Sequence, residues 1–262
     1  MKDSYYFISD VHLGLEDKNK EKLKEKILLT FLDEVKKNAV ELFIIGDLFD
    51  YWIEYREVVP KGYYKIFAKF SELIDEGIKI TYLAGNHDFW RGKYFKDEFG
   101  IEISDKPIER QINGKKFFLH HGDGLAYNDT GYKILKKILR SKVNQFLYSL
   151  VHPDIGIKLA KKSSHSSRFY TSAKDYSKND GIKDYGIEKI KEGFDYAIMG
   201  HRHRPQIISP SGFEGKFYIN LGDWIFNFTY AVFRNENIEL VKYYDLKNDS
   251  YENKIIKPEI IN

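Results

Sequence analysis

Residues 5–12 read YYFISDVH, so a run of aromatic and β-branched residues passes directly into an aspartate and a histidine. Such residues favour extended chain, and we predict a strand over residues 5–9 that ends just before Asp10 and His12. Four more apolar runs along the chain end in polar residues in the same way. They precede GDLFD at 46–50, GNHD at 85–88, HGD at 121–123 and GHRH at 200–203.

The segments between these runs have the patterns of helices and further strands. Residues 18–38 repeat apolar residues every three or four positions, and residues 60–76 open with proline and stop before Gly77, so we predict a helix in each. Alternating strands and helices indicate an α/β fold with a largely parallel sheet, in which ligands bind at the carboxyl ends of strands. Further elements are predicted as strands over 41–45, 78–83, 116–119 and 196–199, a helix over 184–191, and more strands within 217–244.

The side chains of the five motifs are the ligands that two neighbouring divalent cations require. Such a pair needs imidazoles, carboxylates, one shared oxygen anion, and vacant positions for water and a phosphate. We predict that Asp47 is the shared ligand. Asp10, His12 and His203 would complete the first metal site, and Asn86, His121 and His201 the second. The chain has no cysteine, which excludes thiolate sites.

Each motif alone also has an ordinary structural interpretation. An aspartate and a histidine at a strand end usually lie in a surface loop, and glycine followed by Asn or Asp is common in turns. The HRH sequence at 201–203 would equally suit a basic patch. Five such motifs, each after a predicted strand, favour a metal centre over five unrelated loops.

Together the motifs resemble the calcineurin-like metallophosphoesterase superfamily. The resemblance lies in ISDVHLG, GDLFDYW, AGNHDFW, HHGDGL and MGHRHRP, and it covers residues from about 5 to 230. It implies a four-layer αββα sandwich and the metal ligands assigned above. It also implies that His87 contacts the scissile phosphate and that Asp88 orients the His87 imidazole.

The chain between HGD and GHRH interrupts the alternation of strands and helices. Apolar residues recur every three or four positions through 131–151, which predicts one amphipathic helix, broken by Pro153 and Gly156 and followed by a shorter helical piece. We therefore predict a helical cap inserted over 125–182. The phosphoesterase core would comprise residues 1–124 and 183–262.

The predicted cap is the basic part of the molecule. Residues 131–180 contain 11 Lys and Arg against 3 Asp and Glu, a net charge of +8, whereas the whole chain carries only +3. Beside a phosphate site, this charge would concentrate anions and attract an acidic membrane surface, roughly 1 kcal/mol for each nearby Lys or Arg. The ordinary alternative is that these lysines only solvate the outer faces of helices.

The GDLFDYW motif, the cap and GHRHRP resemble one branch of the superfamily, the UDP-2,3-diacylglucosamine diphosphatases. That branch splits a nucleotide lipid into UMP and an acylated sugar phosphate in lipid A biosynthesis. The resemblance implies that the cap houses the acyl chains. It places the substrate contacts at Asp129, Ser167 and Lys174. Thr171 and His87 depart from the branch, which usually has Asn and often Arg at these positions.

These patterns also lead to expectations about cofactor and location. Nitrogen and oxygen ligands suit two divalent cations, which we expect to be Mn²⁺, with Fe²⁺ or Zn²⁺ as alternatives. Residues 1–4 lead straight into a strand, and no apolar run is long enough to cross a bilayer. We therefore expect a cytoplasmic enzyme whose basic cap reaches the inner face of the inner membrane.

Three other functions share much of this pattern. A phosphodiesterase or protein phosphatase with another substrate would use the same ligands. A nuclease would suit the isoelectric point of about 8.6, but a net charge of +3 is modest for a protein that binds nucleic acid, so we disfavour that partner. A non-catalytic scaffold on the same fold would be expected to lack ligands, and all seven are present here.

Overall fold

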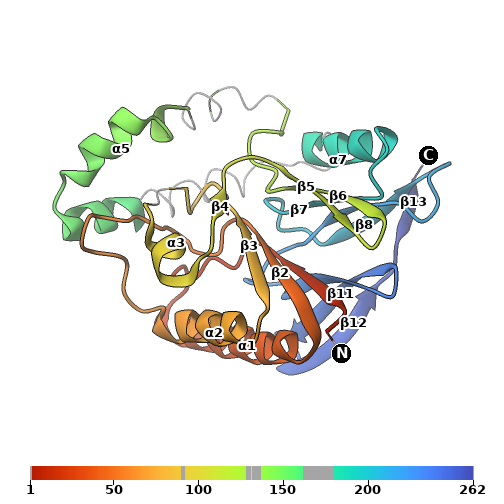
Figure 1. The fold of residues 1–262 in the computed structure, drawn as a ribbon, viewed down its shortest axis with the longest axis horizontal. Helices are drawn as coiled ribbons and strands as arrows, with labels where there is room; N and C mark the ends of the chain where they lie inside the picture. The colour runs from red at the N-terminus through yellow and green to blue at the C-terminus, as the bar shows by residue number, and fades with distance from the viewer. Residues whose placement is uncertain (1, 90–91, 128–130, 132–136, 162–179, 262) are drawn as a thin grey trace.

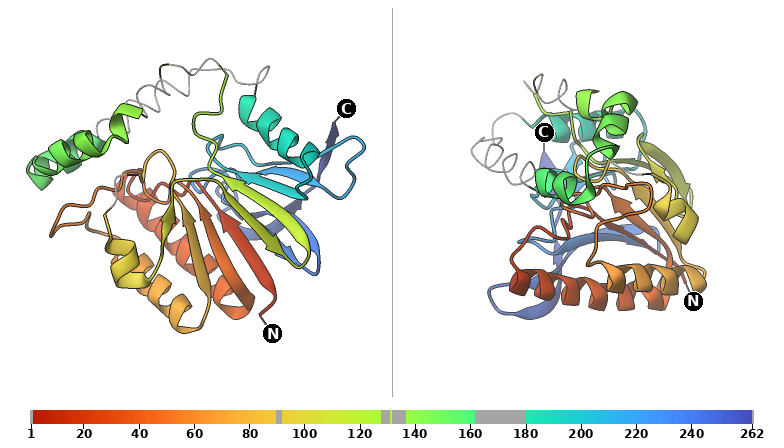
Figure 2. Two further views of the ribbon diagram at one scale, coloured as in Figure 1. Left: turned by 45° about the horizontal axis from the view of Figure 1, so that its top comes forward. Right: turned by 90° about the vertical axis from the view of Figure 1, so that its left-hand side faces the viewer.

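The computed structural model describes residues 2–89, 92–127, 131, 137–161 and 180–261. Two β-sheets face each other, and helices cover their outer faces (Figures 1 and 2). Helices α1 (Lys18–Asn38) and α2 (Tyr64–Asp75) pack on the first sheet, and α7 (Gly181–Lys191) packs on the second. The predicted four-layer αββα sandwich is confirmed.

The first sheet has seven strands in the order β12-β11-β10-β1-β2-β3-β4. Strands β1 to β4 are parallel, and β10 to β12 continue the sheet in antiparallel pairs. The strands are β1 (Ser4–Ile8), β2 (Ala39–Ile45), β3 (Lys79–Leu83), β4 (Ile103–Ser104), β10 (Thr229–Arg234), β11 (Asn237–Asp245) and β12 (Ser250–Ile256).

The second sheet has six strands in the order β13-β8-β9-β7-β6-β5. They are β5 (Ile108–Ile112), β6 (Lys115–His120), β7 (Tyr196–Met199), β8 (Gln206–Pro210), β9 (Phe217–Asn220) and β13 (Glu259–Ile261). Strands β6, β7 and β9 are parallel, whereas β5 pairs antiparallel with β6. The prediction of largely parallel strands therefore holds for β1 to β4, for β6, β7 and β9, and for β13 with β8. It is wrong for β10 to β12, for β5 with β6 and for β8 with β9, which pair antiparallel. Two-residue turns at 113–114 and 235–236, with left-handed φ, are too short for a parallel crossover.

Aromatic packing fixes how the two sheets face each other. The Phe7 ring stacks on Phe43 with centroids 4.7 Å apart and on Phe117 with centroids 5.8 Å apart. Phe7 and Phe43 belong to the first sheet and Phe117 to the second, and all three are fully buried. Because this core holds the sheets together, the carboxyl ends of β1, β2, β3, β6 and β7 meet at one edge.

Local backbone preferences determine where the helices begin and end. Helix α1 has the predicted bounds, and its N-cap Asp17 accepts hydrogen bonds from the amides of Asn19 and Lys20. Helix α2 begins at Tyr64 instead of residue 60, since Gly62 has a φ of 112° that no α-helix accommodates. A short helix, α3 (Tyr94–Phe99), ends at Gly100 in the left-handed region.

The described part of the predicted cap lies outside both sheets (Figure 2). It contains helix α5 (Lys142–Ser149) and a helical segment over 153–161. The single helix predicted over 131–151 is wrong, because Ser141 is extended with a ψ of 128° and separates α5 from the helical residues 137–139. Gly156 lies inside the helical segment 153–161 and does not break it. The boundaries of the cap stay a prediction.

Helix α5 exposes several apolar side chains. None of its residues is buried, and Val143, Phe146 and Leu147 are each more than half exposed. No helix in the described ranges has both the length and the apolar character needed to cross a bilayer.

Candidate metal centre

The five motifs meet at the edge where both sheets present the carboxyl ends of their strands. The loops after β1, β2 and β3 come from the first sheet, and those after β6 and β7 from the second. Backbone hydrogen bonds join the loops: the amide of Asp10 donates to Gly46 O at 3.1 Å, and the amide of Gly200 to His121 O at 3.0 Å. The loops therefore form one connected platform.

Five of the seven predicted ligands have a left-handed backbone. These are Asp10, His12, Asp47, His201 and His203, with φ between 49° and 69°. Such angles are uncommon outside glycine and are typical of functional sites, where the surrounding structure supports the strain. They turn the chain sharply after each strand, which directs the side chains to one centre.

Glycine in these motifs leaves room for the carboxylates. A Cβ at Gly85 would collide with the Asp47 side chain, and a Cβ at Gly200 would collide with that of Asp10. The glycine before Asn86 and the glycine before His201 are therefore required by the close approach of a ligand from another loop.

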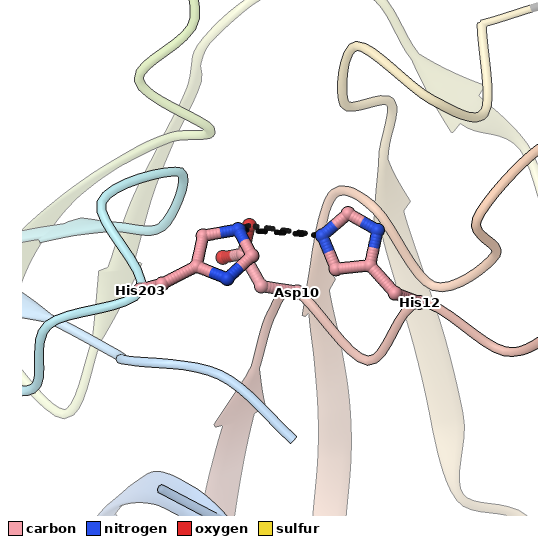
Figure 3. A group of neighbouring side chains, drawn as sticks. All are labelled: Asp10, His12 and His203. Carbon is pink, nitrogen blue, oxygen red and sulfur yellow. Dashed lines mark hydrogen bonds and ion pairs between the residues drawn. The ribbon is translucent and has the colours of Figure 1, made fainter. Parts of the chain in front are cut away.

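The first group of predicted ligands is compact. Asp10 Oδ1 lies 3.2 Å from His203 Nε2 and 3.8 Å from His12 Nε2, and the two histidine nitrogens are 3.4 Å apart. Figure 3 shows the three side chains pointing toward one another, with His203 approaching from the opposite side to His12. The structure thus brings the predicted first metal site together.

The second group adjoins the first through Asp47. His121 Nε2 lies 3.2 Å from Asp47 Oδ2 and 3.1 Å from Asn86 Oδ1, and His201 belongs to the same cluster. Asp47 Oδ2 is also 3.7 Å from His12 Nε2. Asp47 therefore lies between both groups, where a shared ligand is expected.

The donor atoms suit cations better than hydrogen bonds. His121 Nδ1 donates to Ile45 O at 2.8 Å, so Nε2 is the ring atom that faces the oxygens of Asp47 and Asn86 and could bind a cation there. Asp10 Oδ1 is buried and has no hydrogen-bond partner within the described ranges. Lone pairs that face one another in a buried site need a positive charge between them, and nitrogen and oxygen donors bind divalent metals well. The residues therefore fit a pair of metal ions.

Electrostatic interactions in the site favour bound positive charge. Burial raises the pKa of Asp47, but His121, His87 and His12 outweigh this and hold it well below its usual range. Burial lowers the pKa of His121, while Asp47 and other carboxylates raise it to about 10. Burial and the charge of His121 lower the pKa of His201 to about 4. Asp47 thus stays anionic and His201 neutral, the states in which both bind metal.

His87 lies beside the two groups of ligands. Its amide donates to Asp47 Oδ1 at 2.8 Å, and its Nδ1 donates to Asp50 O at 2.8 Å. Its ring centroid is 4.9 Å from that of His12. The predicted contact residue for the phosphate is therefore adjacent to the candidate metals.

The predicted role of Asp88 in orienting His87 is wrong. The Asp88 carboxylate is turned into the core, where it accepts hydrogen bonds from Leu48 N at 2.8 Å, Gly85 N at 2.7 Å and the Tyr82 hydroxyl. Burial, then the charge of Asp47, raise its pKa. Asp88 thereby connects the loop after β2 to the loop after β3. Its carboxylate faces the amides of Leu48 and Gly85 and not the imidazole of His87.

Two carboxylates that sequence reasoning missed support the predicted ligands. Asp50 Oδ1 lies 3.7 Å from His12 Nδ1 and 4.0 Å from His87 Nδ1, and Asp223 Oδ2 lies 3.7 Å from His203 Nδ1. Carboxylates behind ligand imidazoles fix their orientation and tautomer. Gly222-Asp223 follows strand β9 just as the other motifs follow their strands, and this signal could have revealed it.

The side chain of Asp123 is directed toward the predicted cap. Arg140 Nη2 lies 3.4 Å from Asp123 Oδ2 and donates to Gly85 O at 3.0 Å, next to Asn86. Arg140 thereby connects the cap segment to the ligand loops. The predicted substrate contacts Asp129, Ser167 and Lys174, together with Thr171, lie outside the described residues.

Comparison with known proteins agrees with this geometry. Residues 4–205 match the calcineurin-like phosphoesterase family. The chain belongs to this family. The UDP-2,3-diacylglucosamine hydrolase of Porphyromonas gingivalis is 32% identical to this calcineurin-like phosphoesterase over 94% of this chain and 100% of that protein. Proteins of the same name from Pseudomonas syringae and Haemophilus influenzae are 34% and 30% identical, over 83% and 91% of this chain and 86% and 98% of theirs. The family resemblance expected from the five motifs is confirmed.

Proposed function

We propose that this calcineurin-like phosphoesterase hydrolyses UDP-2,3-diacylglucosamine to UMP and 2,3-diacylglucosamine 1-phosphate. The observation that carries the reaction class is the pair of adjoining ligand groups that share Asp47. The substrate is supported by the relatives that bear the name of this hydrolase and align over most of their length. Both phosphates of the pyrophosphate carry negative charge, which the two proposed metal cations would attract.

We assign the metals to the seven predicted ligands and propose Mn²⁺, with Fe²⁺ or Zn²⁺ as alternatives that the same nitrogen and oxygen donors accept. Two bound cations lower the pKa of a water and neutralise charge on the phosphoryl group. Asp47 serves both metals. Asp10, His12 and His203 hold the first, and Asn86, His121 and His201 hold the second.

His87 is the group that we assign to the reacting phosphate. Because Nδ1 donates to Asp50 O at 2.8 Å, Nε2 is the ring atom that we assign to the phosphoryl or leaving oxygen. An imidazole holds or gives a proton near neutral pH, and such proton transfer contributes about 10²–10⁴-fold to a rate. Asp50, 4.0 Å from the same ring nitrogen, limits rotation of the ring.

We further propose that the cap, residues 125–182, selects the lipid. The exposed side chains Phe146, Leu147 and Leu150 would cover acyl chains, while Asp129, Ser167 and Lys174 would contact the sugar phosphate. The net charge of +8 over 131–180 would hold the protein on the acidic inner face of the cytoplasmic membrane.

The proposed function is tested by incubating the purified protein and Mn²⁺ with UDP-2,3-diacylglucosamine and measuring UMP. We expect turnover by the wild type and none by Asp47→Asn, which is the matched control for contaminating hydrolases. Faster cleavage of bis(4-nitrophenyl) phosphate or of single-stranded DNA than of the lipid would overturn the substrate assignment and leave the phosphoesterase centre intact.

Membrane association is tested separately by sedimentation with vesicles. We expect binding to vesicles that contain phosphatidylglycerol, weakened by salt, and little binding to vesicles of phosphatidylcholine alone. Equal binding to both would show that the apolar face of α5, and not the charge of the cap, governs association.

A further inference from the structure

Helix α1 contains a buried lysine that the proposed reaction does not use. Lys24 is 2% exposed, and its Nζ donates a 2.6 Å hydrogen bond to the backbone oxygen of His12. The same ammonium lies 3.2 Å from Glu21 Oε2, one helical turn earlier. Glu21 in turn accepts hydrogen bonds from Gly14 N at 2.7 Å and Glu16 N at 3.1 Å.

The lysine occupies a position where the helix pattern predicts an apolar side chain. Ile27, Leu28 and Phe31 follow it along the same buried face of α1. Burying an ammonium is costly unless it is paired and hydrogen-bonded. Burial lowers the pKa of Lys24, and Glu21 opposes that shift. Its direct partners, His12 and Glu21, both belong to one segment, residues 12–21, and the charges of Glu16 and Asp50 also favour the ammonium.

This segment contains the ligand His12 of the first metal site and begins two residues after the ligand Asp10. Asp10 and His12 have φ of 53° and 49°, so the loop leaves β1 in a conformation that needs external support. The His12 oxygen accepts from Lys24 Nζ and from Leu15 N at 3.2 Å. Lys24 and Glu21 therefore fix the loop from behind, while the His12 ring points into the centre.

Among the described residues, the second metal site has no such connection to α1. Its ligands Asn86, His121 and His201 follow β3, β6 and β7. In the part of the chain that the structure describes, the side-chain hydrogen bonds and ion pairs of Lys24 and Glu21 go only to His12, Gly14, Glu16 and each other. The support is therefore asymmetric between the two sites.

We propose that Lys24 and Glu21 are positioning residues that set the affinity of the first metal site for a divalent cation while leaving the second site unchanged. The inference rests on the two-metal centre proposed above. Residues that orient ligands from behind typically change metal affinity by about 10–100-fold when they are replaced. The effect here reaches the metal through the backbone of His12.

The test is a Mn²⁺ titration of metal-free protein by calorimetry, followed by electron paramagnetic resonance to count coupled Mn²⁺ pairs. We expect the wild type to bind two ions. Lys24→Met, which keeps the length of the side chain, should keep one site unchanged and weaken the other by about 10–100-fold. The coupled-pair signal should then appear only at higher Mn²⁺. Lys20→Met is the matched control, since its side chain is 69% exposed on the same helix and should leave both sites unaltered.

Each outcome separates the inference from the proposed function. If the wild type binds two ions and Lys24→Met binds both as tightly, or weakens both equally, the inference is wrong and the metal centre stands. If the wild type itself binds fewer than two, the proposed function fails. If circular dichroism shows that Lys24→Met does not fold, Glu21→Gln takes its place in the Mn²⁺ titration. This variant keeps the lysine and should still weaken one site alone.

Discussion

The ligand loops and helix α5 are built in opposite ways. The ligand side chains Asp10, Asp47 and His121 are at most 1% exposed, and backbone hydrogen bonds connect the loops that carry them. Helix α5 buries none of its residues, although its sequence is amphipathic. Side chains held within a packed framework keep the geometry that metal chemistry needs, whereas an apolar helix without a core of its own is suited to covering a ligand. The difference agrees with the proposal that the core performs the chemistry and that the cap selects the substrate.

The largest effect should come from the residue shared by both ligand groups. Asp47→Asn removes the charge between the two proposed metals, so we expect no measurable turnover on any phosphoester and loss of bound metal. Turnover and metal content should be measured on the same sample. Near-normal activity with two bound ions would contradict the shared role of Asp47.

His87 should affect the chemistry without affecting the metals. Replacing His87 with Asn removes the imidazole, and we expect kcat to fall by about 10²–10⁴-fold on lipid and small substrates alike. Metal content by atomic emission should stay at the wild-type value. A loss of metal equal to that of Asp47→Asn would instead make His87 a ligand.

Asp50 and Asp88 form a matched pair, because both are buried aspartates near His87. Asp50→Asn should lower kcat by about 10–100-fold, since Asp50 lies behind His12 and His87. Asp88→Asn should mainly lower the free energy of unfolding, by about 1–3 kcal/mol, because one of its hydrogen-bond partners loses an acceptor. Kinetics and denaturant unfolding of both variants test this, and the reverse pattern would restore Asp88 as the partner of His87.

The smallest effect should come from the cap. Phe146 is 62% exposed, so Phe146→Ser should change the free energy of unfolding by less than about 0.5 kcal/mol. On a small aryl phosphodiester its kcat/KM should equal that of the wild type. For the lipid we expect a loss of about 10-fold, as burial of a phenyl ring contributes about 1.5–3 kcal/mol. Equal losses on both substrates would mean that α5 supports the core and does not select the lipid.

Sequence reasoning succeeded where local pattern determines structure. The bounds of α1 and β7 were predicted to the residue, because apolar periodicity marks the helix and a short apolar run marks the strand. Within each sheet the motifs converge because parallel strands end at a shared edge, which the alternation predicts. The αββα sandwich that brings the edges of the two sheets together was implied by the family resemblance. Asp10 and His203, 193 positions apart in the chain, come from different sheets, so their contact needed the resemblance as well as the alternation.

The wrong predictions are those in which the direction of one side chain, or the backbone of one residue, determines the structure. Spacing does not show that the Asp88 carboxylate turns toward Leu48 N and Gly85 N and away from its neighbour His87. Apolar periodicity continues across Ser141, so it conceals the break before α5. The contact of Lys24 with the His12 oxygen joins a helix to a loop, and an isolated lysine in a helix pattern gives no sign of it.

The most direct test of the central claim is a crystal structure of the Mn²⁺-loaded protein with anomalous scattering from the metal. We predict two peaks on either side of Asp47, one contacted by Asp10, His12 and His203 and the other by Asn86, His121 and His201. A single peak, or two peaks with the Asp47 carboxylate directed away from either ion, would contradict the account.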